Sequence, residues 1–207
     1  MSKLKVINLF GPPGVGKSTA AAGLFYLMKR DHFSVEQVTE YAKYLILSGN
    51  EKTLQNEPGK LLAEQYHKQE ILTDFYDYAI TDSPLPLVSY YNQKTPKSFS
   101  AYSFELFDEF DNINLFITRD LTGDAQYETE GRIHTKDQSI KIEQELREYL
   151  SFHQIHFVEF NANRFIAEEL HKHIKRLVWI DEQIPLEIRN TNPEFAAIAD
   201  KFIHSRG

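Results

Sequence analysis

The segment GPPGVGKST, residues 11–19, constrains the fold of this chain more than any other feature. All four residues that the pattern G-x-x-x-x-G-K-[ST] requires are present: Gly11, Gly16, Lys17 and Ser18. The apolar run of residues 3–10 precedes the pattern, and residues 17–30 have the apolar spacing of a helix. A strand, a glycine-rich turn and a helix in this order are typical of a P-loop that binds a nucleoside triphosphate. These flanking elements disfavour a chance glycine-rich turn.

Each residue type in this loop has a physical function in binding phosphate. Glycine lets backbone N–H groups converge on an anion, because no Cβ obstructs the turn. We expect Lys17 to reach the β- and γ-phosphates and the Ser18 hydroxyl to bind Mg²⁺, with the helix N-terminus facing the anion. The residues predicted to bind ATP are Gly11, Pro12, Pro13, Gly14, Val15, Gly16, Lys17, Ser18 and Thr19. The predicted cofactors are therefore ATP and Mg²⁺.

Length and composition limit the remaining possibilities. The 207 residues accommodate one α/β domain, which we expect to span residues 1–178, with a C-terminal extension of residues 179–207 packed on it. The chain has no cysteine, which is compatible with a reducing cytoplasm. Its net charge of −7 disfavours, without excluding, a nucleic-acid partner. We expect no signal peptide or membrane span, because the N-terminal apolar run is short and leads directly into the P-loop.

Short apolar runs alternate with helical patterns along the chain, which predicts a parallel sheet covered by helices on both faces. The predicted strands are residues 3–10, 34–39, 78–81, 114–118 and 155–160. The predicted helices are residues 17–30, 40–47, 59–76, 104–110, 136–152 and 164–178. The polar segment 121–139 is long for a loop in a compact domain, and loops of this length are usually functional or disordered.

Asp82 is the predicted second carboxylate of the P-loop site. It ends the apolar run YAITD, so it approaches the Mg²⁺ of Ser18 from the carboxyl edge of the sheet. The alternative is an ordinary Asp-Ser-Pro turn after a strand. Ser83 follows Asp82, whereas motor ATPases carry a Glu that polarises the attacking water. The Asn-Lys-x-Asp motif by which switch GTPases recognise guanine is also missing.

Glu40 ends the second predicted strand, at the same sheet edge as Gly11 and Asp82. A carboxylate there could accept a proton from a substrate hydroxyl or hold the substrate in register. An acid that caps the following helix explains the same residue. On the next helix, Gln65 and Gln69 share one face and could contact a base edge, although a solvated helical face explains them as well.

Two arginines complete the predicted catalytic set. Arg119 follows the fourth strand, and Arg132 lies in the polar insertion of residues 121–139, with Gly123 and Gly131 as possible hinges. Phosphoryl transfer spreads negative charge over the equatorial oxygens, and arginines on a closing lid stabilise that charge while excluding water. The alternative is a surface loop with incidental ion pairs. The lid is expected at about residues 120–138.

Four segments together resemble the P-loop kinase-like proteins of the AAA_28 type: INLFGPPGVGKSTAAAGLFYLMKR, VTEYAKYLI, YAITDSPL and YETEGRIHTKDQS. This family includes the nicotinamide riboside kinase domain of bacterial bifunctional enzymes and many small bacteriophage proteins. The resemblance covers about residues 3–160 and is closest to the phage proteins. It implies a three-layer P-loop NTPase fold of the nucleoside and nucleotide kinase type, with a five-stranded parallel sheet and a lid insertion. It further implies the cytoplasm of a bacterium or of a phage-infected host.

The resemblance implies ATP binding by residues 11–19, Mg²⁺ and acceptor contacts at Asp82, and lid arginines at Arg119 and Arg132. Ser83 stands where deoxynucleoside and thymidylate kinases have an Arg, which weakens the case for a monophosphate acceptor. The expected activity is an ATP- and Mg²⁺-dependent phosphotransferase that acts on a nucleoside, nucleotide or nucleoside-like small molecule. A kinase of a modified base or end in DNA and a regulatory ATPase without an acceptor stay open as alternatives, as does homodimer formation.

Overall fold

The computed structural model describes residues 3–50, 52, 56–119 and 136–183. Five parallel strands form one sheet in the order β2-β3-β1-β4-β5. The strands are β1 (Lys5–Phe10), β2 (Val35–Val38), β3 (Tyr78–Thr81), β4 (Asp111–Thr118) and β5 (Val158–Asn161). The helices are α1 (Lys17–Arg30), α2 (Tyr41–Leu47), α4 (Pro58–Glu70), α5 (Leu85–Tyr91), α6 (Lys97–Asp108), α7 (Lys136–Phe152) and α8 (Ile166–Gln183).

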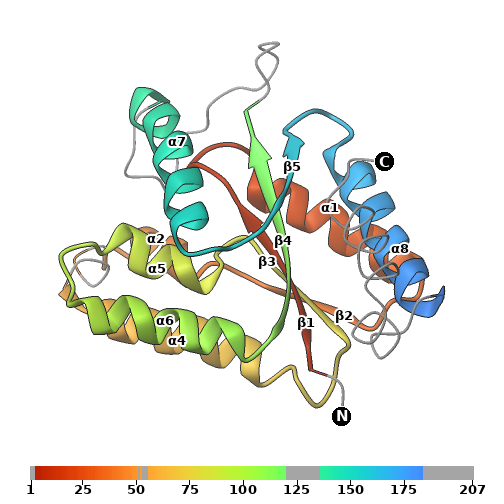
Figure 1. Ribbon diagram of the computed structural model, residues 1–207, viewed down its shortest axis with the longest axis horizontal. Coiled ribbons are helices and arrows are strands. Elements are labelled where there is room, and N and C mark those ends of the chain that lie inside the picture. Colours follow the sequence, from red (N-terminus) through yellow and green to blue (C-terminus); the bar gives the residue numbers. More distant parts are fainter. Residues whose placement is uncertain (1–2, 51, 53–55, 120–135, 184–207) are drawn as a thin grey trace.

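Helices cover both faces of the sheet, so the molecule has three layers (Figure 1). Helices α1 and α8 pack on one face, where Leu24, Leu115 and Ile174 belong to a single apolar cluster. Helices α2, α4, α5, α6 and α7 cover the other face, around a cluster that includes Phe10 and Phe116. The central strands are apolar on both faces because both faces are covered by helices. The predicted three-layer α/β fold with a five-stranded parallel sheet is thus confirmed.

The region between Asp82 and β4 differs most from the sequence prediction. Helix α5 was not predicted, and α6 begins at Lys97 rather than at residue 104. Both helices start directly after a proline, Pro84 or Pro96. Proline fits the first turn of a helix, where its missing N–H would have no partner within the helix. Strand β4 also begins earlier than predicted, at Asp111.

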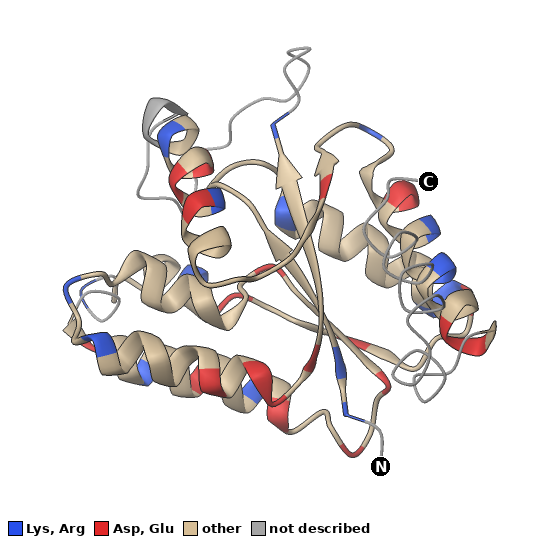
Figure 2. Ribbon diagram, viewed as in Figure 1, with Lys and Arg blue, Asp and Glu red and all other residues tan. Residues whose placement is uncertain are grey.

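Helix α8 continues to Gln183, past the residue 178 at which the last core helix was expected to end. Acidic and basic residues are intermixed along α7 and α8 (Figure 2). Among the described helices, none combines the length and the hydropathy that crossing a bilayer requires. The C-terminal extension beyond residue 183 and most of the predicted lid lie outside the described residues.

Candidate functional site

The predicted site residues follow the carboxyl ends of four neighbouring strands. Across the sheet, in the order β2, β3, β1, β4, these ends carry Glu40, Asp82, the P-loop and Arg119. Parallel strands bring their carboxyl ends to one edge of a sheet, which is where ligands of open α/β folds bind. The fold therefore places two carboxylates on one side of the P-loop and a guanidinium on the other.

The P-loop has a backbone that only glycine adopts easily. Gly11, Gly14 and Gly16 have φ angles of 141°, 79° and 94°. A Cβ on Gly11 would lie 2.5 Å from the carbonyl oxygen of Ile117 in β4. The loop therefore approaches the neighbouring strand too closely for any side chain at Gly11. At Gly16 no atom obstructs a Cβ, so its left-handed φ is the reason for glycine there.

Lys17 and Ser18 begin α1, directly after the loop. The ammonium of Lys17 donates hydrogen bonds to the carbonyl oxygens of Gly11 and Pro12, at 2.9 and 3.0 Å. The charge of Lys17 is thus held within the curve of the loop. Ser18 and Thr19 are exposed in the first helical turn, where hydroxyls and backbone N–H groups are accessible to a bound anion.

Asp82 is buried, with 7% of its surface exposed, directly after the last residue of β3. Its Oδ1 atom has no hydrogen-bond partner among the described residues. A buried carboxylate oxygen without a partner is costly and is therefore a good ligand for a cation or its water shell. The exposed Ser18 hydroxyl and the Asp82 carboxylate are the hard oxygen donors that Mg²⁺ prefers, so these residues fit the predicted metal ion.

Within the described parts of the chain, no group of three His, Asp or Glu side chains is arranged to hold a metal ion. His67, which the sequence does not place at metal-ligand spacing, is exposed and lies 3.2 Å from Glu70 of its own helix.

Glu40 is the residue that precedes α2, and its backbone is extended there. Its side chain makes no capping hydrogen bond to the helix. The capping contact required by the alternative explanation is therefore not formed, although its charge at a helix N-terminus is still favourable. The last paired residues of β2 and β3 are Val38 and Thr81, so Glu40 and Asp82 follow adjacent strand ends.

Arg119 contacts the P-loop directly. Its guanidinium donates to the carbonyl oxygen of Pro13 at 3.2 Å and to the Ser139 hydroxyl of α7, which itself donates to Pro13. Its Nε atom also lies 3.9 Å from Glu143, and only 16% of the side chain is exposed. Arg119 therefore lies beside the P-loop and links this loop to α7. The other predicted lid arginine, Arg132, lies outside the described residues.

Ion pairs continue from Arg119 through α7 to β5. Glu143 accepts a hydrogen bond from Arg147 at 3.0 Å, and Arg147 donates to Glu159 of β5 at 2.8 Å. Burial alone would lower the pKa of Arg147, but the hydrogen bonds to Glu159 and Glu143 raise it above its ordinary value. Arg147 therefore stays charged and holds α7, the helix that follows the predicted lid, against the sheet.

Gln65 and Gln69 are not on a solvated helix face, since each has only 1% of its surface exposed. The Gln65 side chain instead reaches both strand ends, accepting from the Tyr41 N–H at 3.2 Å and donating to the Thr81 hydroxyl at 3.4 Å. The sequence analysis missed this role. Leu61 and Leu62 share the buried side of α4 with the two glutamines. That spacing is the sequence signal that could have revealed the burial of Gln65 and Gln69.

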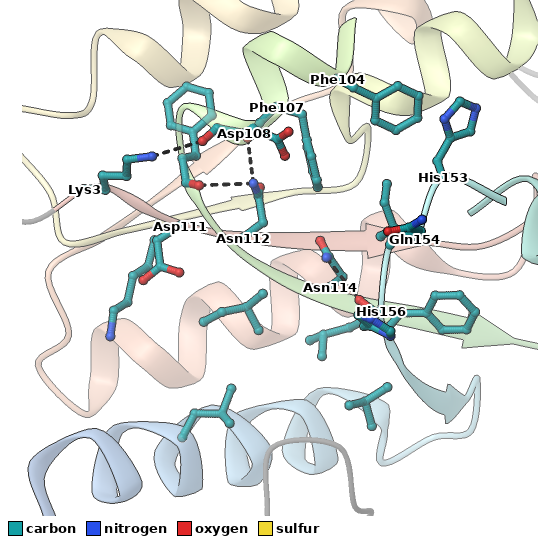
Figure 3. A pocket seen from close by; sticks show the side chains of 18 of the residues that line it. Lys3, Phe104, Phe107, Asp108, Asp111, Asn112, Asn114, His153, Gln154 and His156 are labelled. Atoms are coloured by element: carbon teal, nitrogen blue, oxygen red, sulfur yellow. Dashed lines mark hydrogen bonds between the residues drawn. The ribbon is translucent and has the colours of Figure 1, made fainter. Parts of the chain in front are cut away.

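A cavity of about 1650 Å³ lies elsewhere, at the amino end of β4 (Figure 3). Phe104, Phe107 and Phe157 contribute to its apolar lining. Two of its polar residues are engaged with backbone: Asn112 donates to the carbonyl oxygens of Phe107 and Phe110, and Lys3 to that of Asp108. The P-loop edge, with its buried carboxylate and exposed hydroxyls, is the better candidate for a site of chemistry.

Two comparisons set this chain beside known proteins. A comparison with curated proteins gives no match. Among solved structures, the APS kinase CysC of Mycobacterium tuberculosis, in complex with AMPPNP and APS, is 15% identical, covering 84% of this chain and 98% of its own, with a TM-score of 0.47. The protein APE1195 is 16% identical over 74% of each chain, with a TM-score of 0.39.

The family model matches far more directly. The AAA_28 model, described as an AAA domain, matches residues 6–169, which is well over half of the chain and includes the P-loop, Glu40, Asp82 and Arg119. The sheet order and the P-loop geometry described above are independent of that match and agree with it. This chain therefore belongs to the AAA_28 family and has a three-layer P-loop fold.

Proposed function

We propose that this chain is an ATP- and Mg²⁺-dependent phosphotransferase whose acceptor is a nucleoside, a nucleotide or a similar small molecule. The observation that carries the proposal is the order Glu40, Asp82, P-loop, Arg119 along one sheet edge. An acceptor beside Glu40 would meet the γ-phosphate of a nucleotide in the P-loop across Asp82. In this proposal the phosphate donor, the metal ion and the acceptor would lie next to one another in the spatial order that direct transfer requires.

The donor side consists of the P-loop and its two cations. The backbone N–H groups of residues 11–19 would bind the phosphates, with Lys17 on the β- and γ-oxygens. Arg119 already donates to the Pro13 carbonyl of the loop, and Arg132 would approach from the lid. Both guanidinium groups would stabilise the charge that develops on the transferring group.

Ser18 and Asp82 would hold Mg²⁺, which would neutralise part of the negative charge of the nucleotide phosphates. Asp82 suits this task because its buried Oδ1 has no other partner among the described residues. Ser83 follows Asp82 and has no carboxylate to polarise a water. This favours transfer to an organic acceptor over hydrolysis.

Glu40 would act on the acceptor. Its position beside the end of β3 allows its carboxylate to accept the proton of an acceptor hydroxyl as the phosphoryl group arrives. For an acceptor that is already phosphorylated, the same carboxylate would hold a sugar or base group in register. In either case Glu40 would contribute to phosphoryl transfer and not to the binding of ATP in the P-loop.

A transfer assay with γ-labelled ATP tests this proposal. Nucleosides, nucleoside monophosphates, nicotinamide riboside and DNA would each be offered with Mg²⁺, and label transfer would be measured beside ATP hydrolysis. We expect slow hydrolysis alone and fast transfer to one small acceptor. Glu40→Gln should lower transfer and leave ATP affinity unchanged, because the substitution removes a proton acceptor outside the P-loop.

Two results would contradict the proposal in different ways. Rapid hydrolysis that no acceptor alters would identify a regulatory ATPase. Transfer to DNA with none to small molecules would identify the nucleic-acid kinase that the net charge of −7 disfavours.

A further inference from the structure

We infer that Gln65 of α4 is a positioning residue that fixes Glu40 relative to Asp82. The inference rests on the proposed function, in which these two carboxylates face one acceptor and one metal ion. Among the described residues, the side-chain hydrogen bonds of Gln65 run to Tyr41 and Thr81. Those two residues are the immediate chain neighbours of Glu40 and Asp82.

The need for such a residue follows from the sheet. Pairing between β2 and β3 ends at Val38 and Thr81. Beyond that pair the two chains separate, with Tyr41 entering α2 and Pro84 leading into α5. Glu40 and Asp82 lie in this region of separation, so the hydrogen bonds of the sheet do not set the distance between them.

Helix α4 holds the β2 side of this region on both sides of Glu40. The amide oxygen of Gln65 accepts from the Tyr41 N–H at 3.2 Å, directly after Glu40. Lys68, one turn further along α4, donates to the carbonyl oxygen of Thr39 at 3.3 Å, directly before Glu40. The ammonium of Lys68 also lies 5.3 Å from the centre of the Tyr41 ring. The backbone of Glu40 is therefore fixed by α4 at the two positions that determine where its side chain points.

The same glutamine also reaches the β3 side. Its Nε2 atom donates at 3.4 Å to the hydroxyl of Thr81, which is fully buried. That hydroxyl also accepts from the Ser83 N–H at 3.1 Å, so it lies at the centre of the turn that contains Asp82. Gln65 thus joins the turn of Asp82 to the start of α2 through one side chain.

An amide is the group that this position requires. One end must accept from a backbone N–H and the other must donate to an oxygen, and a neutral glutamine does both without burying a charge. With 1% of its surface exposed, Gln65 cannot exchange these partners for bulk water. A hydrocarbon side chain of equal length would fill the space and lose both contacts.

The chain supplies a matched control. Gln69 is four residues further along α4 and is equally buried, but among the described residues its amide donates to the Gln65 backbone carbonyl alone, at 3.5 Å. We would compare Gln65→Met with Gln69→Met, since methionine keeps the length and flexibility of glutamine. Thr81→Val and Thr81→Ser form a second pair, because only serine retains the hydroxyl that Gln65 reaches.

Four quantities would be measured on the full chain: kcat and acceptor KM in the transfer assay, the Kd of MgATP, and the hydrogen exchange rate of the Tyr41 amide. We expect Gln65→Met to lower kcat/KM for the acceptor by about 100-fold, the usual effect of misplacing a reacting group by about 1 Å. We expect the Kd of MgATP to change little and exchange at Tyr41 to accelerate. Thr81→Val should repeat the loss of transfer, and Gln69→Met and Thr81→Ser should retain wild-type transfer.

Each contrary result has a distinct meaning. Equal losses in Gln65→Met and Gln69→Met, or a parallel loss of MgATP affinity, would show a general packing defect and overturn the inference. Unchanged transfer in an active Gln65→Met variant would overturn it as well. If the wild-type chain binds MgATP but transfers to no acceptor, the proposed function fails, and the positioning role fails with it whatever happens at Tyr41.

Discussion

Lys17 and Asp82, two side chains of the candidate site, differ in how the protein satisfies their charges. The ammonium of Lys17 donates to two loop carbonyls, so its charge has partners within the P-loop. Asp82 is buried, and its Oδ1 atom has no partner among the described residues. A buried polar atom without a partner costs about 1–3 kcal/mol, which a fold retains where function requires the group.

We therefore predict opposite effects of Asp82→Asn on stability and on binding. Without Mg²⁺ the variant should be as stable as the wild type or about 1 kcal/mol more stable, because a buried carboxylate becomes neutral. Its affinity for MgATP should fall roughly 10- to 100-fold, since contacts to a charged group are worth about 1.5–3 kcal/mol. Urea unfolding and nucleotide titrations with and without Mg²⁺ measure the two effects.

Asp77→Asn is the control for this substitution, because Asp77 is exposed and precedes the amino end of β3. It should change neither quantity. If Asp82→Asn lowers stability but leaves the Mg²⁺-dependent affinity for ATP unchanged, Asp82 does not bind the metal ion. That result would favour the alternative in which Asp82 belongs to an ordinary Asp-Ser-Pro turn.

At the scale of elements, the strands were predicted better than the helices between them. Each of the five strands contains buried apolar residues, and the central strands β1 and β3 are the most apolar. A parallel strand that is covered on both faces is recognised by such residues. Helix α5 was missed and the start of α6 was misplaced, and each of these helices follows a proline, Pro84 or Pro96. Proline stops a preceding helix and also starts a following one, and the sequence alone does not distinguish these effects.

The contact between α1 and α8 has a titratable group that predicts pH-dependent stability. His171 of α8 is buried, with its Nε2 atom 3.3 Å from the carboxylate of Asp31 at the end of α1. Burial lowers the pKa of His171, and the nearby Asp31 only partly opposes this effect. The unfolded chain therefore takes up a proton at higher pH than the folded chain does. The contribution of neutral His171 to the free energy of unfolding is therefore complete above pH about 6.5, and it is lost as the pH falls below that value.

We expect the free energy of unfolding to decrease between pH 7.5 and pH 5.5, as measured by urea unfolding. His171→Gln should make that decrease smaller, because glutamine does not titrate. Part of the decrease should persist, since burial also lowers the pKa of His153 in the same direction. An identical pH profile in the variant would contradict the assignment to His171.

At the scale of the whole molecule, the candidate site depends on several elements at once. The P-loop follows β1, approaches β4 at Gly11 and is joined to α7 through Arg119 and Ser139. A nucleotide bound there would contact groups that only the folded chain brings together. Binding should therefore stabilise the native state as a unit.

We predict that MgATP raises the melting temperature. At 100 times its Kd a ligand adds about 2.7 kcal/mol, which corresponds to roughly 5–10 °C for a chain of this length. Lys17→Ala should abolish most of this shift, because the variant loses the phosphate contact of the ammonium. Thermal unfolding with and without MgATP measures the shift.

Lys3→Ala is the matched control for that experiment. Lys3 lies beside the cavity at the amino end of β4 and donates to the Asp108 carbonyl (Figure 3). Its variant should retain the full MgATP shift. Loss of the shift in Lys3→Ala with retention in Lys17→Ala would place nucleotide binding in the cavity and would contradict the P-loop site.

The sequence by itself determined the P-loop, the five strands and the positions of Glu40 and Asp82 after strand ends. Each of these depends on residues that are adjacent in the chain, because backbone geometry and burial follow from local patterns. The tertiary structure decided which side chains meet. Gln65 reaches Tyr41 across 24 residues, and Arg119 reaches Pro13 across 106. Such contacts depend on how helices pack on the sheet, and no local pattern in one sequence encodes that packing.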